Sequence, residues 1–288
     1  MRISDLYARS EKPVISFEFF PPKTDAGYRS LYRTIAELKH LDPGFVSVTW
    51  GAGGSTRAKT VDLVVQIQRE LGIPAMAHMT CVGSPRAELA ETLERLVREG
   101  LHNVLALRGD PPKDATHFEP VADGFAHASE LVAFVRSRFD LCIGAACYPE
   151  KHPDAPSAEA DLARLVEKVA AGTDFLITNL FFDADDYFAF VARARAAGIG
   201  VPIVPGIMPV VSAANVRRMA QLTGARIPHA LEVELARTGE DDDATQEVGI
   251  AWATDQCRRL LAGGVPGLHF YTLNRSPAAR RVFENLLA

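Results

Sequence analysis

The segment VISFEFFPPK, residues 14–23, places one carboxylate, Glu18, within an otherwise apolar and aromatic run. Carboxylates are seldom fully buried, because removing their charge from water is costly unless a partner compensates it. Glu18 is therefore either one half of a buried ion pair, with Arg108 or Arg275 as the opposite charge, or a functional group that faces a pocket.

Polar side chains also lie at or near the ends of six further apolar runs. They are Thr49 and Trp50, His78 and Thr80, Arg108 to Asp110, Tyr148 to His152, Thr178 and Asn179, and Tyr271 to Arg275. Single members have structural explanations: His78 can be a hydrogen-bonded core histidine, and Asp110 can organise the turn before Pro111. Asp161 and Lys168 share a helix face and can be solvated charges. Because seven runs contribute polar groups at the same end, the pattern indicates a site.

Composition and motifs argue against several classes of partner. The net charge is −5 without a basic stripe, so neither nucleic acid nor an anionic membrane is expected as a partner. No apolar run reaches the roughly 20 residues of a membrane span, and the first residues lack the apolar core of a secretory signal. The four cysteines form no CxxC pair and no metal-ligand spacing. These features predict a cytoplasmic protein with reduced cysteines and no metal site.

Short apolar runs alternate with amphipathic helical stretches along the whole chain, which predicts parallel strands joined by helices. The eight predicted strands are 14–20, 45–50, 75–81, 103–109, 142–148, 175–182, 203–207 and 267–273. Two or three additional helices are expected within 212–263. The pattern predicts an α/β fold, a single (β/α)8 TIM barrel domain over 1–288 with extra helices between strands seven and eight. A doubly wound sheet is the alternative, weakened because no GxGxxG opens the first helix.

Eight segments in order resemble the methylenetetrahydrofolate reductases. They are SFEFFPPK, VSVTWGAGGSTR, AHMTC, LALRGDPP, AACYPEKHP, ADLARLVEKVAAGTDFLIT, PGIMPV and HFYTLNRS. The resemblance implies an FAD-containing barrel of the short bacterial form, without a regulatory domain, that forms a homo-oligomer. It also implies reduction of 5,10-methylenetetrahydrofolate to 5-methyltetrahydrofolate, in the one-carbon metabolism that serves methionine biosynthesis. NADH or NADPH is implied to reduce the flavin and then leave, after which the folate takes its place.

The same resemblance implies roles for individual residues. Glu18 corresponds to the proton donor and Asp110 to an acid near both the flavin and the folate. The implied cofactor-binding positions are Thr49, Trp50, Ala52, His78, Arg108, Gly109, Asp110, Ala128, Tyr148, His152, Asp161 and Lys168. The implied substrate-binding positions are Glu18, Asp110, Asn179 and Arg275.

The implied reaction explains why a carboxyl group is needed at Glu18. Hydride transfer requires an N5-iminium cation, which forms when a proton reaches N10 and opens the five-membered ring of the folate. An ordinary glutamic acid, with a pKa of about 4.3, is ionised at neutral pH. We expect burial against Phe17, Phe19 and Phe20 to raise the pKa of Glu18, so that it holds this proton in the folate complex. A negative charge at Asp110 is expected to disfavour the anionic reduced flavin and to favour the iminium cation.

Two positions depart from the family pattern. Asn179 stands where members usually carry glutamine, and Ala213 stands where many carry an aromatic residue that stacks on the nicotinamide. Ordinary variation with NADH still used is one interpretation. Poor use of NADH is another, with a different electron partner or with oxidation of 5-methyltetrahydrofolate as the reaction. A related barrel flavoenzyme such as a proline dehydrogenase, and a folate- or flavin-binding subunit of a redox complex, are further alternatives.

Overall fold

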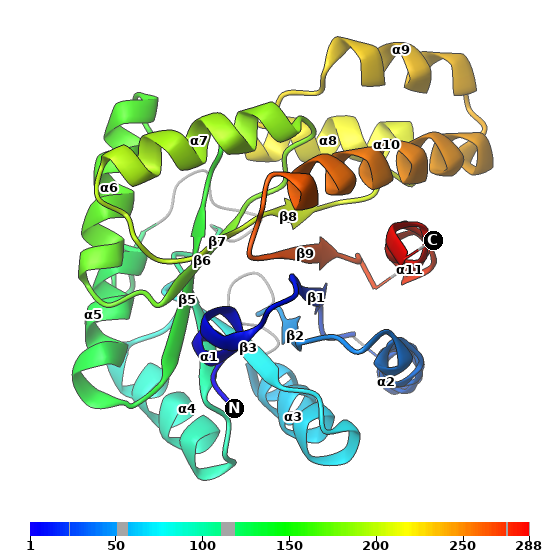
Figure 1. The fold of residues 1–288 in the computed structure, drawn as a ribbon. Coiled ribbons are helices and arrows are strands. Elements are labelled where there is room, and N and C mark those ends of the chain that lie inside the picture. Colours follow the sequence, from blue (N-terminus) through cyan, green and yellow to red (C-terminus); the bar gives the residue numbers. More distant parts are fainter. Residues whose placement is uncertain (23, 51–56, 111–118, 275, 288) are drawn as a thin grey trace.

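Nine short parallel strands form one curved sheet at the centre of the protein (Figure 1). The computed structural model describes residues 1–22, 24–50, 57–110, 119–274 and 276–287. The strands are β1 Val14–Phe19, β2 Phe45–Val48, β3 Ala75–Thr80, β4 Asn103–Leu107, β5 Cys142–Cys147, β6 Phe175–Thr178, β7 Ile203–Val204, β8 Gly206–Ile207 and β9 Gly267–Tyr271. All eight predicted strand positions are confirmed, although most of the strands end one to four residues earlier than predicted.

The predicted strand 203–207 is divided at Pro205, which closes the sheet into a barrel. Residues before the proline pair with β6, and residues after it pair with β9. Pro205 has no backbone N–H and so cannot donate to a neighbouring strand, but its carbonyl accepts from the backbone N–H of His269 at 3.0 Å. One segment thus bridges both edges of the sheet, so the predicted (β/α)8 barrel is confirmed with its seventh strand in two pieces.

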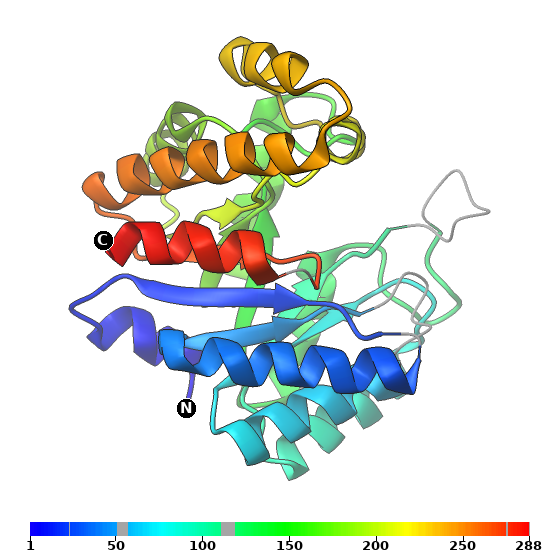
Figure 2. The ribbon, with the colours of Figure 1, turned by 90° about the vertical axis from the view of Figure 1, so that its right-hand side faces the viewer.

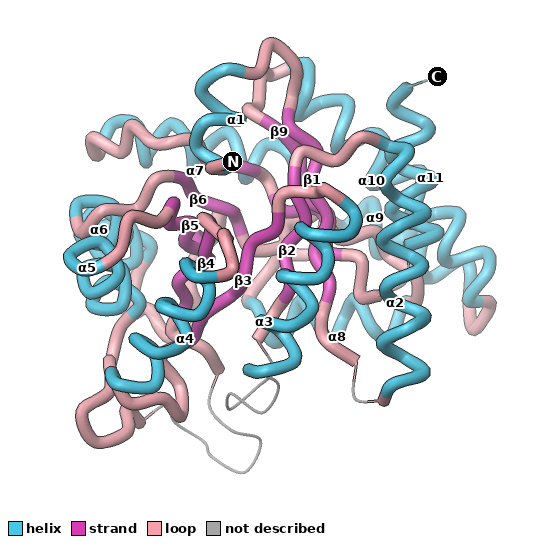
Figure 3. The backbone as a smooth tube through the Cα atoms, turned by 90° about the horizontal axis from the view of Figure 1, so that it is seen from below, coloured by secondary structure: helices cyan, strands magenta, loops and turns pink. Residues whose placement is uncertain are grey.

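Helices cover the outside of the barrel (Figure 3). They are α2 Asp25–Leu38, α3 Arg57–Gln66, α4 Arg86–Arg98, α5 Ala128–Arg138, α6 Ala158–Ala170, α7 Ala184–Ala196, α8 Ala213–Thr223, α9 His229–Thr238, α10 Asp242–Ala262 and α11 Ser276–Leu287. A 3-10 turn, Lys39–Leu41, follows α2, and a π-helical turn, Ile67–Leu71, continues α3. The additional helices predicted within 212–263 are α8, α9 and α10, which lie together on one side of the barrel (Figures 1 and 2).

A short helix that the sequence interpretation missed, α1 Ile3–Arg9, covers the end of the barrel where β1 begins (Figure 2). Its Ile3 side chain is fully buried in an apolar cluster that includes Phe45 and Phe175. The buried Asn103 side chain accepts from the backbone N–H of Ile3 at 2.8 Å and donates to the carbonyl of Met1 at 3.1 Å. Because α1 packs on the amino-terminal end, the strand ends that carry the predicted site residues lie at the opposite end.

Candidate active site

The Glu18 carboxylate lies on the inner face of the barrel between two histidines from other strands. Its Oε2 is 3.3 Å from Nε2 of His269 on β9, which donates to it, and 3.3 Å from Nε2 of His78 on β3. The contact with His78 has ion-pair distance but not the alignment of a hydrogen bond. On its other side, His269 Nδ1 is 2.8 Å from Ser16 Oγ. We call Ser16, Glu18, His78 and His269 the glutamate–histidine cluster.

The expectation that apolar neighbours raise the pKa of Glu18 is wrong for this structure. Burial does raise it, but the charge of His78 and the hydrogen bond from His269 outweigh burial and lower the pKa from 4.5 to about 2. Strand alternation directs Phe17 and Phe19 into the outer core, where Phe17 stacks on Phe270 with ring centroids 5.6 Å apart. Neither phenylalanine therefore forms the dry wall that was expected around the carboxylate.

The structural ion pair considered for Glu18 also differs from the expectation. Arg108 pairs with Asp154, with 2.8 Å between Nη2 and Oδ2, while Arg275 lies outside the described residues. The residue that sequence reasoning missed is His269, which is fully buried. Its position two residues before Tyr271, on the same face of a strand, is the signal that could have identified it.

A second group of predicted residues surrounds Tyr148, just past the end of β5. The Tyr148 ring lies 4.7 Å from the His152 ring, edge to face. Burial, followed by the carboxylate of Asp110, raises the pKa of Tyr148 to about 12, although a hydrogen bond with Asn179 and the charge of Arg108 oppose the rise. The tertiary structure thus brings together five residues that follow the ends of β4, β5 and β6. We call Arg108, Asp110, Tyr148, His152 and Asn179 the Tyr148 cluster.

Two charged residues of α6 extend this cluster. Asp161 Oδ2 accepts from the backbone N–H of His152 at 3.0 Å. Lys168 is half-buried and its Nζ donates to the carbonyl of Ala146 at 2.5 Å. Burial lowers the pKa of Lys168, and burial followed by the charge of Arg108 lowers the pKa of His152. Asp161 and Lys168 are therefore directed at the strand end and are not merely solvated charges.

Gly109 requires its residue type. Its φ is +85°, and a Cβ placed on it would lie 2.9 Å from the Cβ of Thr80 and 2.8 Å from Val82. Both the backbone conformation and the close approach therefore demand glycine.

The other predicted cofactor residues lie in different environments, and not all of them face the inside of the barrel. Thr49 is half-buried and its carbonyl accepts from Thr60 Oγ1 at 2.8 Å. Ala128 is the first residue of α5. Trp50 is 7% exposed and belongs to the apolar core outside the barrel, so the structure does not bring its ring to the inner face. Ala52 lies outside the described residues.

A cavity of about 190 Å³ opens beside Glu18, and we call it the Glu18 cavity. Its lining comprises Glu18, Phe20, Asn179, Leu180, Met208, Met219, Tyr271, Thr272 and Leu273. Asn179 Oδ1 accepts from the backbone N–H of Leu180 at 2.7 Å, and the hydroxyl of Tyr271 donates to the carbonyl of Thr178 at 2.7 Å. The predicted substrate residues Glu18 and Asn179 thus line the same cavity, and the hydrogen bond to Thr178 orients Tyr271 in its wall.

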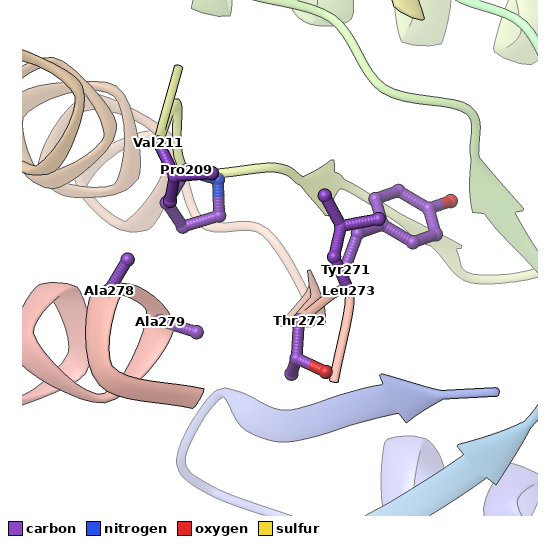
Figure 4. A pocket seen from close by; sticks show the side chains of 7 residues that line it. All are labelled: Pro209, Val211, Tyr271, Thr272, Leu273, Ala278 and Ala279. Carbon is purple, nitrogen blue, oxygen red and sulfur yellow. The ribbon is translucent and has the colours of Figure 1, made fainter. Parts of the chain in front are cut away.

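A smaller hollow adjoins the Glu18 cavity and shares Tyr271, Thr272 and Leu273 with it (Figure 4). Pro209 and the small side chains of α11 form its other side. Its volume of about 10 Å³ is at the lower limit for a single water molecule.

Among the described residues, no group of three or more His, Cys, Asp or Glu side chains is arranged to hold a metal ion. No described helix is both long and apolar enough to cross a membrane.

Comparison with solved structures agrees with the barrel architecture. A Clostridium thermocellum protein described as binding two copies of 5-methyl-5,6,7,8-tetrahydrofolic acid superposes with a TM-score of 0.66 at 17% identity, covering 99% of this chain and 97% of that one. At this identity the likeness concerns the fold alone.

Comparison with sequences identifies the family. An Arabidopsis thaliana methylenetetrahydrofolate reductase (NADH) is 40% identical over 282 residues, which are 94% of this chain and 48% of that protein. The chain spans about half the length of the plant and yeast relatives that it matches. The 5,10-methylenetetrahydrofolate reductase of Salmonella typhimurium is 37% identical, with 94% of this chain and 90% of that protein covered. The family model for methylenetetrahydrofolate reductase matches residues 2–287. The chain therefore belongs to the methylenetetrahydrofolate reductase family.

Proposed function

We propose that this protein interconverts 5,10-methylenetetrahydrofolate and 5-methyltetrahydrofolate by hydride transfer through FAD, within a single barrel domain. The observation that carries the proposal is the Glu18 carboxylate, which faces a ring-sized cavity at the carboxyl end of the barrel and contacts two imidazoles. Family membership supports the same reaction. So do the name of the Salmonella relative and the folate described for the Clostridium protein of the same fold.

The glutamate–histidine cluster suits the delivery of a proton to N10 of the folate. Ser16 Oγ donates to the carbonyl of Leu268 at 3.3 Å, which leaves its oxygen free to accept from His269 Nδ1. His269 Nε2 faces the Glu18 carboxylate, so both nitrogens of a doubly protonated imidazole have acceptors. The hydrogen-bonded chain from Ser16 through His269 thus ends at Glu18 Oε2, from which we propose that Glu18 passes a proton to the substrate.

Substrate binding supplies the condition under which Glu18 can take up that proton. The Glu18 side chain is 16% exposed, and its exposed part faces the cavity that it lines. A ligand that fills the cavity removes the remaining water, which disfavours the carboxylate relative to the carboxylic acid. The low pKa of the open site and a protonated Glu18 in the folate complex are therefore compatible.

The residues around Tyr148 fit a flavin nucleotide. FAD, when bound, supplies the hydride acceptor and donor. The guanidinium of Arg108 and the ammonium of Lys168 suit its phosphates or ribityl hydroxyls. The hydroxyl of Thr80 is buried and makes no hydrogen bond within the described part of the chain, so a bound cofactor can satisfy it. The residues proposed to hold FAD are Thr49, Ala52, His78, Arg108, Gly109, Asp110, Ala128, Tyr148, His152, Asp161 and Lys168. Trp50 would contribute only its main chain, because its ring packs in the core outside the barrel.

Asp110 and Asn179 connect the cofactor and folate regions, because both act on Tyr148. The exposed carboxylate of Asp110 disfavours negative charge on the cofactor and stabilises positive charge on the folate. Asn179 lies in the wall of the Glu18 cavity and offers an amide to the pterin. Arg275 is proposed as a further folate ligand.

NADH is the proposed reductant, because the Arabidopsis relative carries it in its name. A second candidate, oxidation of 5-methyltetrahydrofolate with another electron partner in place of a nicotinamide, is favoured by Asn179. The Asn179 side chain is shorter than glutamine, and its oxygen already accepts from the backbone N–H of Leu180.

We propose that the protein is a cytoplasmic homo-oligomer. Its four cysteines are all free and buried, which agrees with a reducing compartment. Light scattering after size-exclusion chromatography measures its subunit number.

Anaerobic stopped-flow spectroscopy tests the proposal. The wild-type flavin absorbance is followed after mixing with NADH, NADPH and 5-methyltetrahydrofolate in separate experiments. Glu18→Gln should retain flavin and its reduction by the nicotinamide, but should lose folate turnover by at least about 100-fold. Glu91→Gln, at an exposed position of α4, is the matched control and should behave as wild type. Full folate turnover in Glu18→Gln, or a protein that binds no FAD, would contradict the proposal.

A further inference from the structure

Two methionines form part of the apolar wall of the Glu18 cavity. Met208 directly follows β8 and is 5% exposed, whereas Met219 comes from α8 and is half-buried. Both pack in one apolar cluster with Leu180 and Val216. Met219 thus projects from a helix outside the barrel into the cavity that Glu18 lines from the inner face.

The placement of α8 changes the meaning of Ala213. Ala213 is the first residue of α8, and among the described residues it is not part of the cavity lining. The α8 residue that does line the cavity is Met219, six positions later. Residue 213 has no aromatic ring, but the thioether side chain of Met219 already forms this part of the cavity wall.

The cavity has the size and chemistry for a flat ring. Its volume of about 190 Å³ exceeds that of a cavity of about 150 Å³ that binds benzene in another protein. Leu180, Leu273 and the two methionines make it largely apolar, and Glu18 and Asn179 supply polar groups. Thioethers make favourable contacts with aromatic rings, and the unbranched methionine side chain adapts to the shape of its ligand.

We propose that Met208 and Met219 form the platform against which a planar heterocycle packs in the Glu18 cavity, and that Met219 contributes to the affinity for this ligand. The ligand class is the pterin ring of a reduced folate, an identification that rests on the proposed function. Met208 is almost fully enclosed and completes the wall. Met219 is the adjustable part, because it is half-buried and belongs to a different element from the residues that carry the polar groups.

Binding of 5-methyltetrahydrofolate to the protein with its flavin already reduced, measured by anaerobic isothermal titration calorimetry, tests this platform, because the reduced flavin cannot accept the hydride. Met219→Ala should raise the dissociation constant about 3- to 10-fold. Flavin reduction at saturating folate should stay within about twofold of wild type, because the platform acts on binding and not on the proton or hydride. Met219→Leu keeps the apolar volume and should bind within about twofold of wild type. Leu222→Ala, on the same helix and 62% exposed, is the matched control and should change nothing.

Each outcome separates this inference from the function on which it rests. A wild-type dissociation constant retained in Met219→Ala would overturn the platform and leave the proposed function intact. Failure of the wild-type protein to bind 5-methyltetrahydrofolate would overturn both. If Met219→Ala does not fold, Met219→Gln serves in its place, since it keeps the side-chain length but is polar. Weakened binding in that variant supports the apolar platform, and unchanged binding overturns it.

Discussion

Replacement of Glu18 by glutamine should remove a pH-dependent part of the stability of the folded protein. The folded state lowers the pKa of Glu18 from 4.5 to about 2, because its contacts with His78 and His269 outweigh burial. A group with a depressed pKa in the folded state stabilises that state above its unfolded pKa. This stabilisation is lost as the pH falls through the folded value. The window for Glu18 is therefore from about pH 4.5 down to about pH 2.

The magnitude follows from the shift. One pKa unit corresponds to about 1.4 kcal/mol, so the full effect is at most about 3 kcal/mol. About 2 kcal/mol of this stabilisation should already be lost at pH 3, because pH 3 lies well below the unfolded pKa of 4.5 and only slightly above the folded pKa of about 2. Glutamine cannot ionise, so Glu18→Gln lacks this contribution at every pH. The difference in unfolding free energy between wild type and variant should therefore shrink between pH 5 and pH 3.

Guanidinium denaturation of both proteins at several pH values between 5 and 3 measures this difference. Taking the difference cancels the titration of all other carboxylates that the two proteins share. Glu91→Gln, at an exposed position, should show no pH-dependent difference from wild type. A wild-type-minus-Glu18→Gln difference that stays constant from pH 5 to pH 3 would refute the assignment of the low pKa to the glutamate–histidine cluster.

Two further predictions concern the strand end after β4. Asp110→Asn should raise the flavin midpoint potential and slow folate reduction, because it removes a negative charge that the proposed function places near the cofactor. Spectroelectrochemistry that finds an unchanged potential would count against this role. Gly109→Ala should destabilise the fold by about 1–3 kcal/mol in chemical denaturation, because strain at φ +85° adds to a clash with Thr80. Gly198→Ala, with φ +88° but open space around it, should show only the strain; equal losses in both variants would exclude the clash.

The alternation of apolar runs and helices was sufficient to predict the barrel, because parallel strands buried on both faces must be apolar almost throughout. It was not sufficient for the division at Pro205, since the residues on either side are as apolar as in any other strand. Nor did it reveal α1, a helix of seven residues whose Ile3 is buried in an apolar cluster at the amino-terminal end of the barrel. Both features depend on packing between segments far apart in the chain.

The sequence by itself determined which residues stand at the carboxyl end of the barrel: the placements of Glu18, Asp110, Tyr148 and Asn179 all follow from their positions at or after strand ends. Only the tertiary structure decided how Glu18 ionises. Its local neighbours are aromatic and predicted a raised pKa, whereas the closed barrel brings His78 from β3 and His269 from β9 to its carboxylate and lowers it. The physical reason is that a pKa responds to charges within a few ångströms in space, and here those charges lie 60 and 251 residues away along the chain.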